Sequence, residues 1–266
     1  MFGLRIIYDE YGRTGNRFFA YLDSIGWAIL NNKKVVILFP ENILKHFDNF
    51  RNSQYVCLPL WGKSQILWRI FRKVFQYNKI SRSLLRTKLA SMLGFYAGWD
   101  DLRESHRYYP KVKSQIKVLF LPNDDIRKPI DESFKKVHTE GYKIVGVHIR
   151  KEDYKTAYGG AYYYDDSVFI SYMQQIAHLI PNCKFYISSN ENISSSFSEQ
   201  FSLVDKPINS AVGDLYSLSQ CDYIIGPPST FNCWASFIGD APLYTMFVKD
   251  GSITLDSFSV IRSDKL

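Results

Sequence analysis

Apolar residues recur along the start of the chain in the pattern of strands alternating with a helix. Residues 4–8 and 35–39 are short apolar runs typical of buried strands. Between them, apolar positions recur at helical spacing over residues 18–29. We therefore expect the order strand, loop, helix, strand, with Gly12 and Gly15 in the loop after the first strand.

The second half of the chain repeats this alternation more regularly. Apolar runs and helical periodicity predict strands at residues 144–149, 184–188, 222–225 and 243–248, and helices at residues 167–179, 213–220 and 230–238. Such alternation is typical of a parallel sheet covered by helices on both faces. We expect an α/β protein of two units, residues 1–135 and 136–266.

Composition and length agree with a folded protein of this kind. The chain has 266 residues, of which 46% are apolar and 22% charged, which argues against disordered and collagen-like proteins. No apolar run reaches the roughly 18 residues of a membrane span, and the start lacks the basic and apolar blocks of a signal peptide. We expect a cytoplasmic protein.

The net charge of +7 is concentrated in one segment. Residues 49–99 contain no acid and nine bases, so the rest of the chain is slightly acidic. Over residues 64–93 apolar and basic residues alternate at helical spacing, which predicts one or two helices. Residues 63–88 could lie on an anionic membrane surface and so meet a lipid-linked glycan, or could form a solvated helix face packed on the first unit.

Several familiar sites are missing from the sequence. The four cysteines form no Cys-x-x-Cys pair, and no His/Cys cluster suggests zinc. There is no Asp-x-Asp pair to hold a metal on a nucleotide-sugar, no Walker loop and no Gly-x-Gly-x-x-Gly. We expect no metal and no bound cofactor, which leaves arginines and helix N-termini to hold any diphosphate.

Polar loops follow three of the predicted strands, at the edge where α/β sheets bind ligands. The first loop is Gly12-Arg13-Thr14-Gly15-Asn16-Arg17. Its glycines allow close approach of the backbone, and the helix that follows offers free N–H groups to an anion. An ordinary strand-to-helix turn with solvated arginines explains the same residues.

The second loop begins at His148 and Arg150, which the alternation of the strand places on one face at its exit. Arginine there can bind phosphate oxygens with two N–H groups. Asp153 could hold Arg150 in place or bind a sugar hydroxyl. A surface salt bridge without function is the alternative.

The third loop breaks an apolar strand at Pro227 and Pro228, after which Ser229 or Thr230 caps a new helix. Capping alone explains part of this pattern. A helix N-terminus at a strand exit also suits a diphosphate.

Together these segments resemble the fucosyltransferases, a group that includes glycosyltransferase family 11 and the α-1,6 and protein O-fucosyltransferases. His148-x-Arg150-x-x-Asp153-Tyr154 resembles their H-x-R-x-x-D-[YF] motif. Residues 12–17 are similar to their G-x-x-G-N-Q loop, and residues 214–234 to their D-L-x-x-[ML]-S-x-C…S-S-F-S-W-W segment. The three motifs occur in the same order, from residue 12 to about residue 239, and leave out the basic middle.

The resemblance implies a GT-B-like fold of two Rossmann-like lobes with the donor cleft between them, residues 1–135 forming the acceptor side and residues 136–266 binding the nucleotide-sugar. It also implies a GDP-fucose donor and inversion at the anomeric carbon without a metal. Arg150 would bind the diphosphate and stabilise its charge as it leaves, and His148 would contact the nucleotide or ribose. The helix start at Ser229, Thr230 and Phe231 would hold the phosphates.

The remaining implied roles involve both lobes. Asp214 would support the guanosine pocket, while Arg13, Gly15 and Asn16 would face the donor sugar from the first lobe. Among carboxylates near the predicted cleft, Glu10 is our candidate general base; a solvated carboxylate is the alternative.

This chain departs from the family pattern at a few positions. Arg17 replaces the usual Gln, Cys233 replaces the first Trp, and Ser189-Asn190 stands where two acids are often found.

The expected activity is transfer of fucose from GDP-fucose to a glycan hydroxyl, as in surface polysaccharide synthesis. One alternative is a GT-B-like transferase with another nucleotide-sugar or a pyruvyl donor. The other is a non-enzymatic nucleic-acid or glycan-binding protein, which the 19 Phe, 19 Tyr and 5 Trp and the basic segment favour. Because no RNA-binding motif is present, we expect no nucleic-acid partner.

Overall fold

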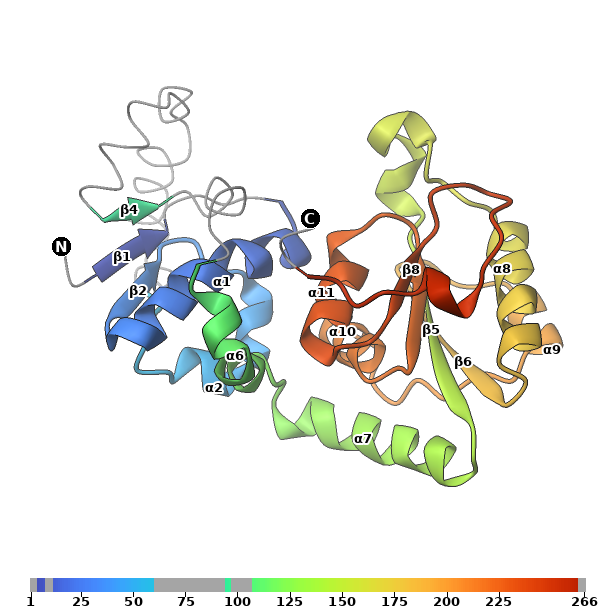
Figure 1. Cartoon of the computed structure of the whole chain (residues 1–266), viewed down its shortest axis with the longest axis horizontal. Coiled ribbons are helices and arrows are strands. Elements are labelled where there is room, and N and C mark those ends of the chain that lie inside the picture. Colours follow the sequence, from blue (N-terminus) through green and yellow to red (C-terminus); the bar gives the residue numbers. More distant parts are fainter. Residues whose placement is uncertain (1–3, 8–11, 60–93, 97–106, 263–266) are drawn as a thin grey trace. The chain divides into compact units, whose positions relative to one another are not determined.

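The computed structural model describes residues 4–7, 12–59, 94–96 and 107–262, and these form two compact units, Met1–Asn123 and Asp124–Leu266 (Figure 1). Each unit contains one four-stranded parallel sheet. The expected fold class, α/β with two parallel sheets, is confirmed. The expected helices over residues 64–93 lie outside the described residues.

The first unit has the strand order β3-β2-β1-β4. Strand β1 (Leu4–Ile7) pairs with β2 (Lys34–Ile37) and with β4 (Phe95–Tyr96), and β2 pairs with β3 (Val56–Cys57). Helix α1 (Thr14–Asn31) connects β1 to β2 and is buried along most of its length because apolar residues occupy nearly all its faces.

Shorter helices complete the first unit. They are the 3-10 helices η1 (Asn42–His46) and η3 (Tyr109–Val112) and the α-helices α2 (Asp48–Arg51) and α6 (Lys113–Leu119). Phe18 of α1, Phe50 of α2 and Phe120 form a tilted aromatic cluster, with Phe120 4.9 Å from each of the other two ring centres. This cluster is the centre of the first core.

The second unit has the strand order β6-β5-β7-β8. Its strands are β5 (Lys143–Ile149), β6 (Cys183–Ser189), β7 (Tyr223–Gly226) and β8 (Leu243–Thr245). Its helices are α7 (Asp124–Thr139), α8 (Asp166–Leu179), α9 (Ser196–Gln200), α10 (Ala211–Ser219) and α11 (Thr230–Gly239). The 3-10 helices η4 (Glu152–Lys155) and η5 (Ala157–Gly160) follow β5, and η6 (Leu255–Ser257) lies near the end.

Helices cover both faces of this sheet, with α8 and α9 on one side and α10 and α11 on the other (Figure 1). Val145 and Val147 of β5 pack in the core formed with α8. Gly146, between them, faces α10, because a Cβ there would lie 2.7 Å from a methyl carbon of Leu218. The alternation of β5 therefore sends His148 to the face of α10 and α11.

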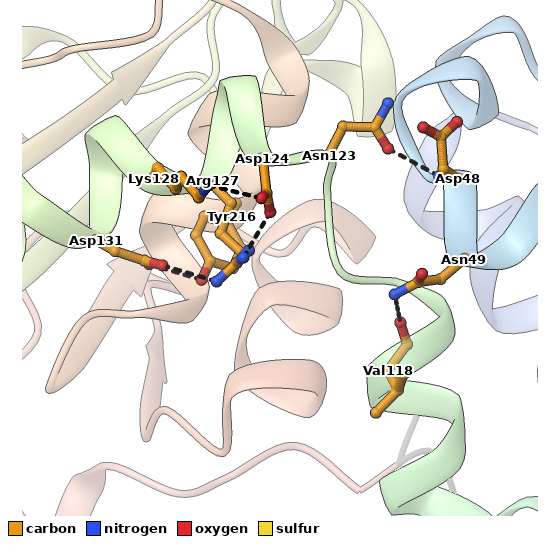
Figure 2. Close-up of polar contacts among 9 residues, drawn as sticks. All are labelled: Asp48, Asn49, Val118, Asn123, Asp124, Arg127, Lys128, Asp131 and Tyr216. Atoms are coloured by element: carbon orange, nitrogen blue, oxygen red, sulfur yellow. Dashed lines mark hydrogen bonds and ion pairs between the residues drawn. The ribbon is translucent and has the colours of Figure 1, made fainter.

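The boundary between the two units lies between Asn123 and Asp124 along the chain, whereas the sequence predicted it between residues 135 and 136 (Figure 2). The amide oxygen of Asn123 accepts a hydrogen bond from the backbone N–H of Asp48 in the first unit (2.8 Å). Helix α7 instead packs on the second unit: the Tyr216 hydroxyl donates to Asp131 (2.7 Å). Arg127 binds Asp124 and Asp131 along the same helix.

Helix α7 was not expected from the sequence, although its signal is present. Ile126, Ile130, Phe134 and Val137 are buried at helical spacing among charged residues. Pro129 lies inside the helix, one turn after its start, and because proline has no N–H the carbonyl of Asp125 receives no helical hydrogen bond from position 129.

Across the described ranges, no helix is both long and apolar enough to cross a bilayer. All four cysteines are free.

Candidate functional site

Arg150 follows the last residue of β5 and is held by three hydrogen bonds. Its Nε and one terminal nitrogen donate to the two carboxylate oxygens of Asp153 (3.0 and 2.7 Å), and the other terminal nitrogen donates to the Ser229 hydroxyl (2.9 Å). Its guanidinium lies 4.8 Å from the ring centre of Tyr154. Asp153 therefore holds Arg150 in place, one of the two roles that its sequence position suggested.

Arg150 remains positively charged although its side chain is largely buried. Burial alone would lower the pKa of Arg150, but the hydrogen bonds to the Asp153 carboxylate raise it above its ordinary value. Among the described residues, two of the five guanidinium N–H groups have no partner. They are available to an anion such as a phosphate.

His148 lies in β5, two residues before Arg150, on the face of the sheet that α10 and α11 cover. Its side chain is only 7% exposed, and its ring stacks on that of Phe231 with centres 5.1 Å apart. Burial, and then the nearby Arg150 charge, lower the pKa of His148 to about 3, so the imidazole is neutral at pH 7. Its buried Nδ1 atom has no hydrogen-bond partner within the described residues, which leaves a polar atom for a ligand or a water.

The N-terminus of α11 is built next to this strand end. Ser229 is the N-cap: its hydroxyl accepts from the backbone N–H of Phe231 (3.2 Å) and from Arg150. Thr230 is the first residue of the helix, and no acidic residue lies in its first turn. The helix start and Arg150 therefore direct positive charge to the same place.

Two side chains hold the turn of Pro227 and Pro228 that precedes α11. The Asn232 amide donates to the carbonyl of Pro227 (2.9 Å), and the Tyr154 hydroxyl donates to the carbonyl of Pro228. Asn232 is fully buried, and a Cβ on Gly226 would lie 2.8 Å from its amide nitrogen. No sequence pattern points to Asn232, because its burial and its hydrogen bond to Pro227 depend on the fold.

Asp214 lies in the first turn of α10, where its carboxylate is occupied. It accepts a hydrogen bond from the Tyr186 hydroxyl (2.7 Å) and pairs with the Lys206 ammonium (2.8 Å). Burial, and then Asp214, raise the pKa of Tyr186, which keeps its hydroxyl protonated as a donor. The structure places Asp214 in an internal polar network of the second unit.

The glycine loop belongs to the first unit and is described from Gly12 onward. Gly12 has φ of +63°, a left-handed conformation that favours glycine, and a Cβ there would overlap the Asn16 side chain. Arg17 donates from Nε to the carbonyl of Gly12 (3.2 Å), and Thr14 donates to Glu41 (2.9 Å). The loop is folded on itself at the N-terminus of α1, with Gly15 buried.

Arg13 occupies the N-cap position of α1 and is exposed, and Asn16 is half-buried. Glu10 and residues 63–88 lie outside the described residues. In the described part of the chain, no three His, Cys, Asp or Glu side chains lie together in a way that could hold a metal ion.

A family model described as glycosyl transferase family 11 matches residues 41–246, more than half of the chain. The match includes the segments of His148–Asp153 and 214–234 and also the basic segment, whereas the glycine loop at 12–17 precedes it. No curated protein sequence matches the chain.

Solved structures resemble the chain at low identity. A mutant of Arabidopsis thaliana FUT1 in complex with GDP aligns with a TM-score of 0.56 and 12% identity, covering 96% of this chain and 73% of that one. POFUT1 in complex with GDP-fucose aligns at 0.52 and 11%, covering 88% and 94%. The α-1,6-fucosyltransferase NodZ soaked with GDP-fucose, an enzyme found in Bradyrhizobium, aligns at 0.50 and 15%, covering 95% and 96%. At these identities the likeness concerns the fold.

Proposed function

Because the chain belongs to glycosyl transferase family 11, we propose that it transfers fucose from GDP-fucose to a hydroxyl group of a glycan. It is a glycosyltransferase with a GT-B-like fold. The family supports the reaction class. The named ligands of the similar structures, GDP and GDP-fucose, support the donor.

The observation that carries this proposal is the position of Arg150. Its guanidinium is oriented by Asp153 and Ser229, while two N–H groups remain for a ligand next to the start of α11. When the bond from the anomeric carbon to the diphosphate breaks, negative charge develops on the diphosphate oxygens. Donors fixed in advance at that point stabilise the transition state more than the ground state.

In the proposed reaction, Arg150 and the helix start at Ser229, Thr230 and Phe231 hold the diphosphate. An acceptor hydroxyl attacks the anomeric carbon from the opposite side, so the bond to fucose forms as the bond to GDP breaks, with inversion. The carbon passes through an oxocarbenium-like state, and the proton of the hydroxyl goes to a base, for which Glu10 is our candidate.

His148 has the role of a neutral contact for the nucleotide or ribose. Its low pKa supports this role, because a neutral imidazole can contact a base or a ribose hydroxyl through hydrogen bonds and leaves the diphosphate charge to Arg150. We assign Asp214 a supporting role for the guanosine pocket through α10, since its carboxylate oxygens already bind Tyr186 and Lys206. Arg13, Gly15 and Asn16 would face the sugar from the first unit.

We further propose that no metal is required, because Arg150 and the α11 N-terminus supply positive charge at the diphosphate. Turnover is then expected to stay within about twofold after treatment with EDTA. A loss that added Mg²⁺ or Mn²⁺ restores would show that a metal takes part.

The nine bases of residues 49–99 support contact with an anionic membrane at the cytoplasmic face, where a lipid-linked glycan for a surface polysaccharide would be found. Flotation with liposomes tests this contact. The protein is expected to float with vesicles that contain anionic lipid and to stay behind with neutral vesicles. Equal behaviour in both would reject membrane contact.

Calorimetric titration of the donor tests the proposed function. GDP-fucose is expected to bind, and to be hydrolysed slowly without acceptor, while UDP-sugars do not bind. Preference for GDP-mannose or a UDP-sugar would instead assign the protein to a GT-B-like transferase with another donor. Salt-sensitive binding of arbitrary RNA without any nucleotide-sugar would identify a nucleic-acid-binding protein.

A further inference from the structure

A row of aromatic rings leads away from Arg150 along the surface of the second unit. The first ring, Tyr154, lies under the guanidinium and 6.1 Å from the ring of Tyr158. Tyr158 lies 5.5 Å from Tyr162, and Tyr162 lies 6.5 Å from Phe247. We call Tyr158, Tyr162 and Phe247 the aromatic row. Figure 1 shows the η4–η5 segment standing out beyond the strand ends of the second sheet.

The aromatic row is exposed to solvent. Tyr158 is 70% exposed and Phe247 is 63% exposed, while Tyr162 is half-buried. In the described part of the chain, the hydroxyls of Tyr158 and Tyr162 make no hydrogen bond. Neighbouring exposed rings of this kind mark binding surfaces more often than scattered single ones do.

The backbone around Phe247 is fixed although its side chain is exposed. The Tyr164 hydroxyl donates to the carbonyl of Met246 (2.9 Å), and the Tyr172 hydroxyl donates to the carbonyl of Val248 (2.7 Å). These bonds hold the segment on both sides of Phe247. Because this backbone is already ordered, little conformational freedom is lost when a ligand binds to the exposed ring.

The backbone at Tyr158 is unfavourable for a large side chain. Its φ is +53°, and Gly159 and Gly160 follow with φ of +65° and +79°. Glycine or asparagine adopts this left-handed region more readily than tyrosine. A tyrosine held there, with its ring exposed, gives little to the core, and such strain is often found at ligand sites.

We infer that the aromatic row binds the acceptor as a neutral oligosaccharide, with its sugar rings stacked on Tyr158, Tyr162 and Phe247. This inference rests on the proposed function. The C–H groups on one face of a pyranose carry partial positive charge and lie well against the negative face of an aromatic ring. The free phenol hydroxyls can bond the sugar hydroxyls at the edge.

The length and position of the row favour a glycan over the base of the donor. A single base covers one ring. Tyr158, Tyr162 and Phe247 meet edge to face, with interplanar angles of 68° and 69°, so they offer separate ring faces to successive sugars. Since the row begins beside Tyr154, a glycan on it would have one end near Arg150, where the proposed donor phosphates are held.

The test compares the wild type with the double variant Tyr158→Asn, Phe247→Ala. Asparagine removes the ring at 158 and suits its left-handed backbone, so the fold is expected to remain. Tyr142→Ala is the matched control, because it removes an exposed aromatic ring that precedes β5 and contacts Lys184. The probe is a printed array of neutral di- to hexasaccharides, read in the presence of GDP, together with GDP titration.

The wild type and Tyr142→Ala are expected to bind the same oligosaccharides on the array. The double variant is expected to lose at least about tenfold in affinity for them while its GDP affinity stays within about twofold. Undiminished glycan binding by the double variant would overturn the inference. So would a wild type that binds no oligosaccharide, or a double variant whose GDP affinity collapses, which would place the base on the row.

Failure of the proposed function has a different signature. A wild type that binds neither GDP nor GDP-fucose would reject the donor, whereas the array would still report the aromatic row. Tyr158→Phe, which keeps the ring, is expected to retain most of the glycan affinity, and this distinguishes stacking from a general disturbance of η5.

Discussion

His148 is buried, stacks on Phe231 and lies near the charge of Arg150. Burial and this charge lower its pKa, so the imidazole is neutral at pH 7. The sequence predicted His148 and Arg150 near the end of a strand, and β5 ends at Ile149, between them. The stacking on Phe231 and the unpartnered Nδ1 could not be predicted, because they depend on how α11 packs against β5. Likewise, the sequence showed Asp214 in a motif but not that Tyr186 and Lys206 occupy its carboxylate.

The low pKa of His148 makes stability depend on pH. The pKa of about 3 in the folded state lies below the ordinary value of 6.5, so the unfolded state binds the proton first as pH falls. The free energy of unfolding is therefore highest above about pH 6.5 and decreases as the pH falls toward 3. From about pH 7.5 to about pH 5 this group is expected to remove up to about 2 kcal/mol.

Urea unfolding of wild type and His148→Gln at both pH values measures this difference. His148→Gln is expected to lose less stability on acidification than the wild type by that amount. His178→Gln, which removes an exposed histidine from α8, is the control and is expected to follow the wild type. Parallel pH dependence of wild type and His148→Gln would contradict a neutral, buried His148.

At the scale of elements, most strands and helices of the second unit were predictable, because β5, β6, α8 and α11 have clear periodicity and Gly or Pro boundaries. The N-cap at Ser229 was expected from residue type. The sequence could not show that the same hydroxyl also accepts from Arg150, since the two residues are far apart in the chain. Helix α7 was missed because its apolar face lies among charged residues.

Comparison with a second N-cap separates the two roles of Ser229, which are to cap α11 and to bind Arg150. Ser229 and Ser210 are the N-caps of α11 and α10, and each hydroxyl accepts a backbone N–H of its own helix. Both Ser→Ala changes are expected to lower the free energy of unfolding by about 1 kcal/mol. Of the two variants, only Ser229→Ala is expected to weaken GDP binding, by about tenfold, because Arg150 loses one of the hydrogen bonds that orient it.

Calorimetry with GDP and chemical unfolding of both variants check this expectation. If Ser229→Ala binds GDP as tightly as Ser210→Ala, the hydroxyl acts only as a cap, and the link from α11 to Arg150 is not functional.

At the scale of the whole molecule, the two-unit organisation was predictable from the repeated strand–helix alternation, but the boundary was not. It depends on α7 packing against the second unit through Phe134, whose ring lies 5.7 Å from that of Tyr186, and through Asp131. Only the folded contacts reveal to which unit such a connecting helix belongs.

Fragments of the second unit test this boundary. Residues 124–266 are expected to unfold cooperatively, with one transition in circular dichroism. Residues 136–266 lack Ile126, Ile130 and Phe134, each of which contributes about 1.5–3 kcal/mol of apolar burial, so this fragment is expected to be much less stable or aggregated. Equal stability of the two fragments would show that α7 is not part of the second unit.

We expect Arg150 to stabilise the departing diphosphate, and the variant Arg150→Ala removes this stabilisation. Arg127→Ala is the matched control, since Arg127 also binds two carboxylates of the second unit but lies on α7, where no site residue is assigned. Circular dichroism and unfolding of both variants establish that they are folded. The decisive measurement is GDP-fucose turnover by the folded variants against the wild type. We expect turnover to fall at least about a hundredfold in Arg150→Ala and to change little in Arg127→Ala. Near-normal turnover by Arg150→Ala would show that Arg150 does not stabilise the departing diphosphate.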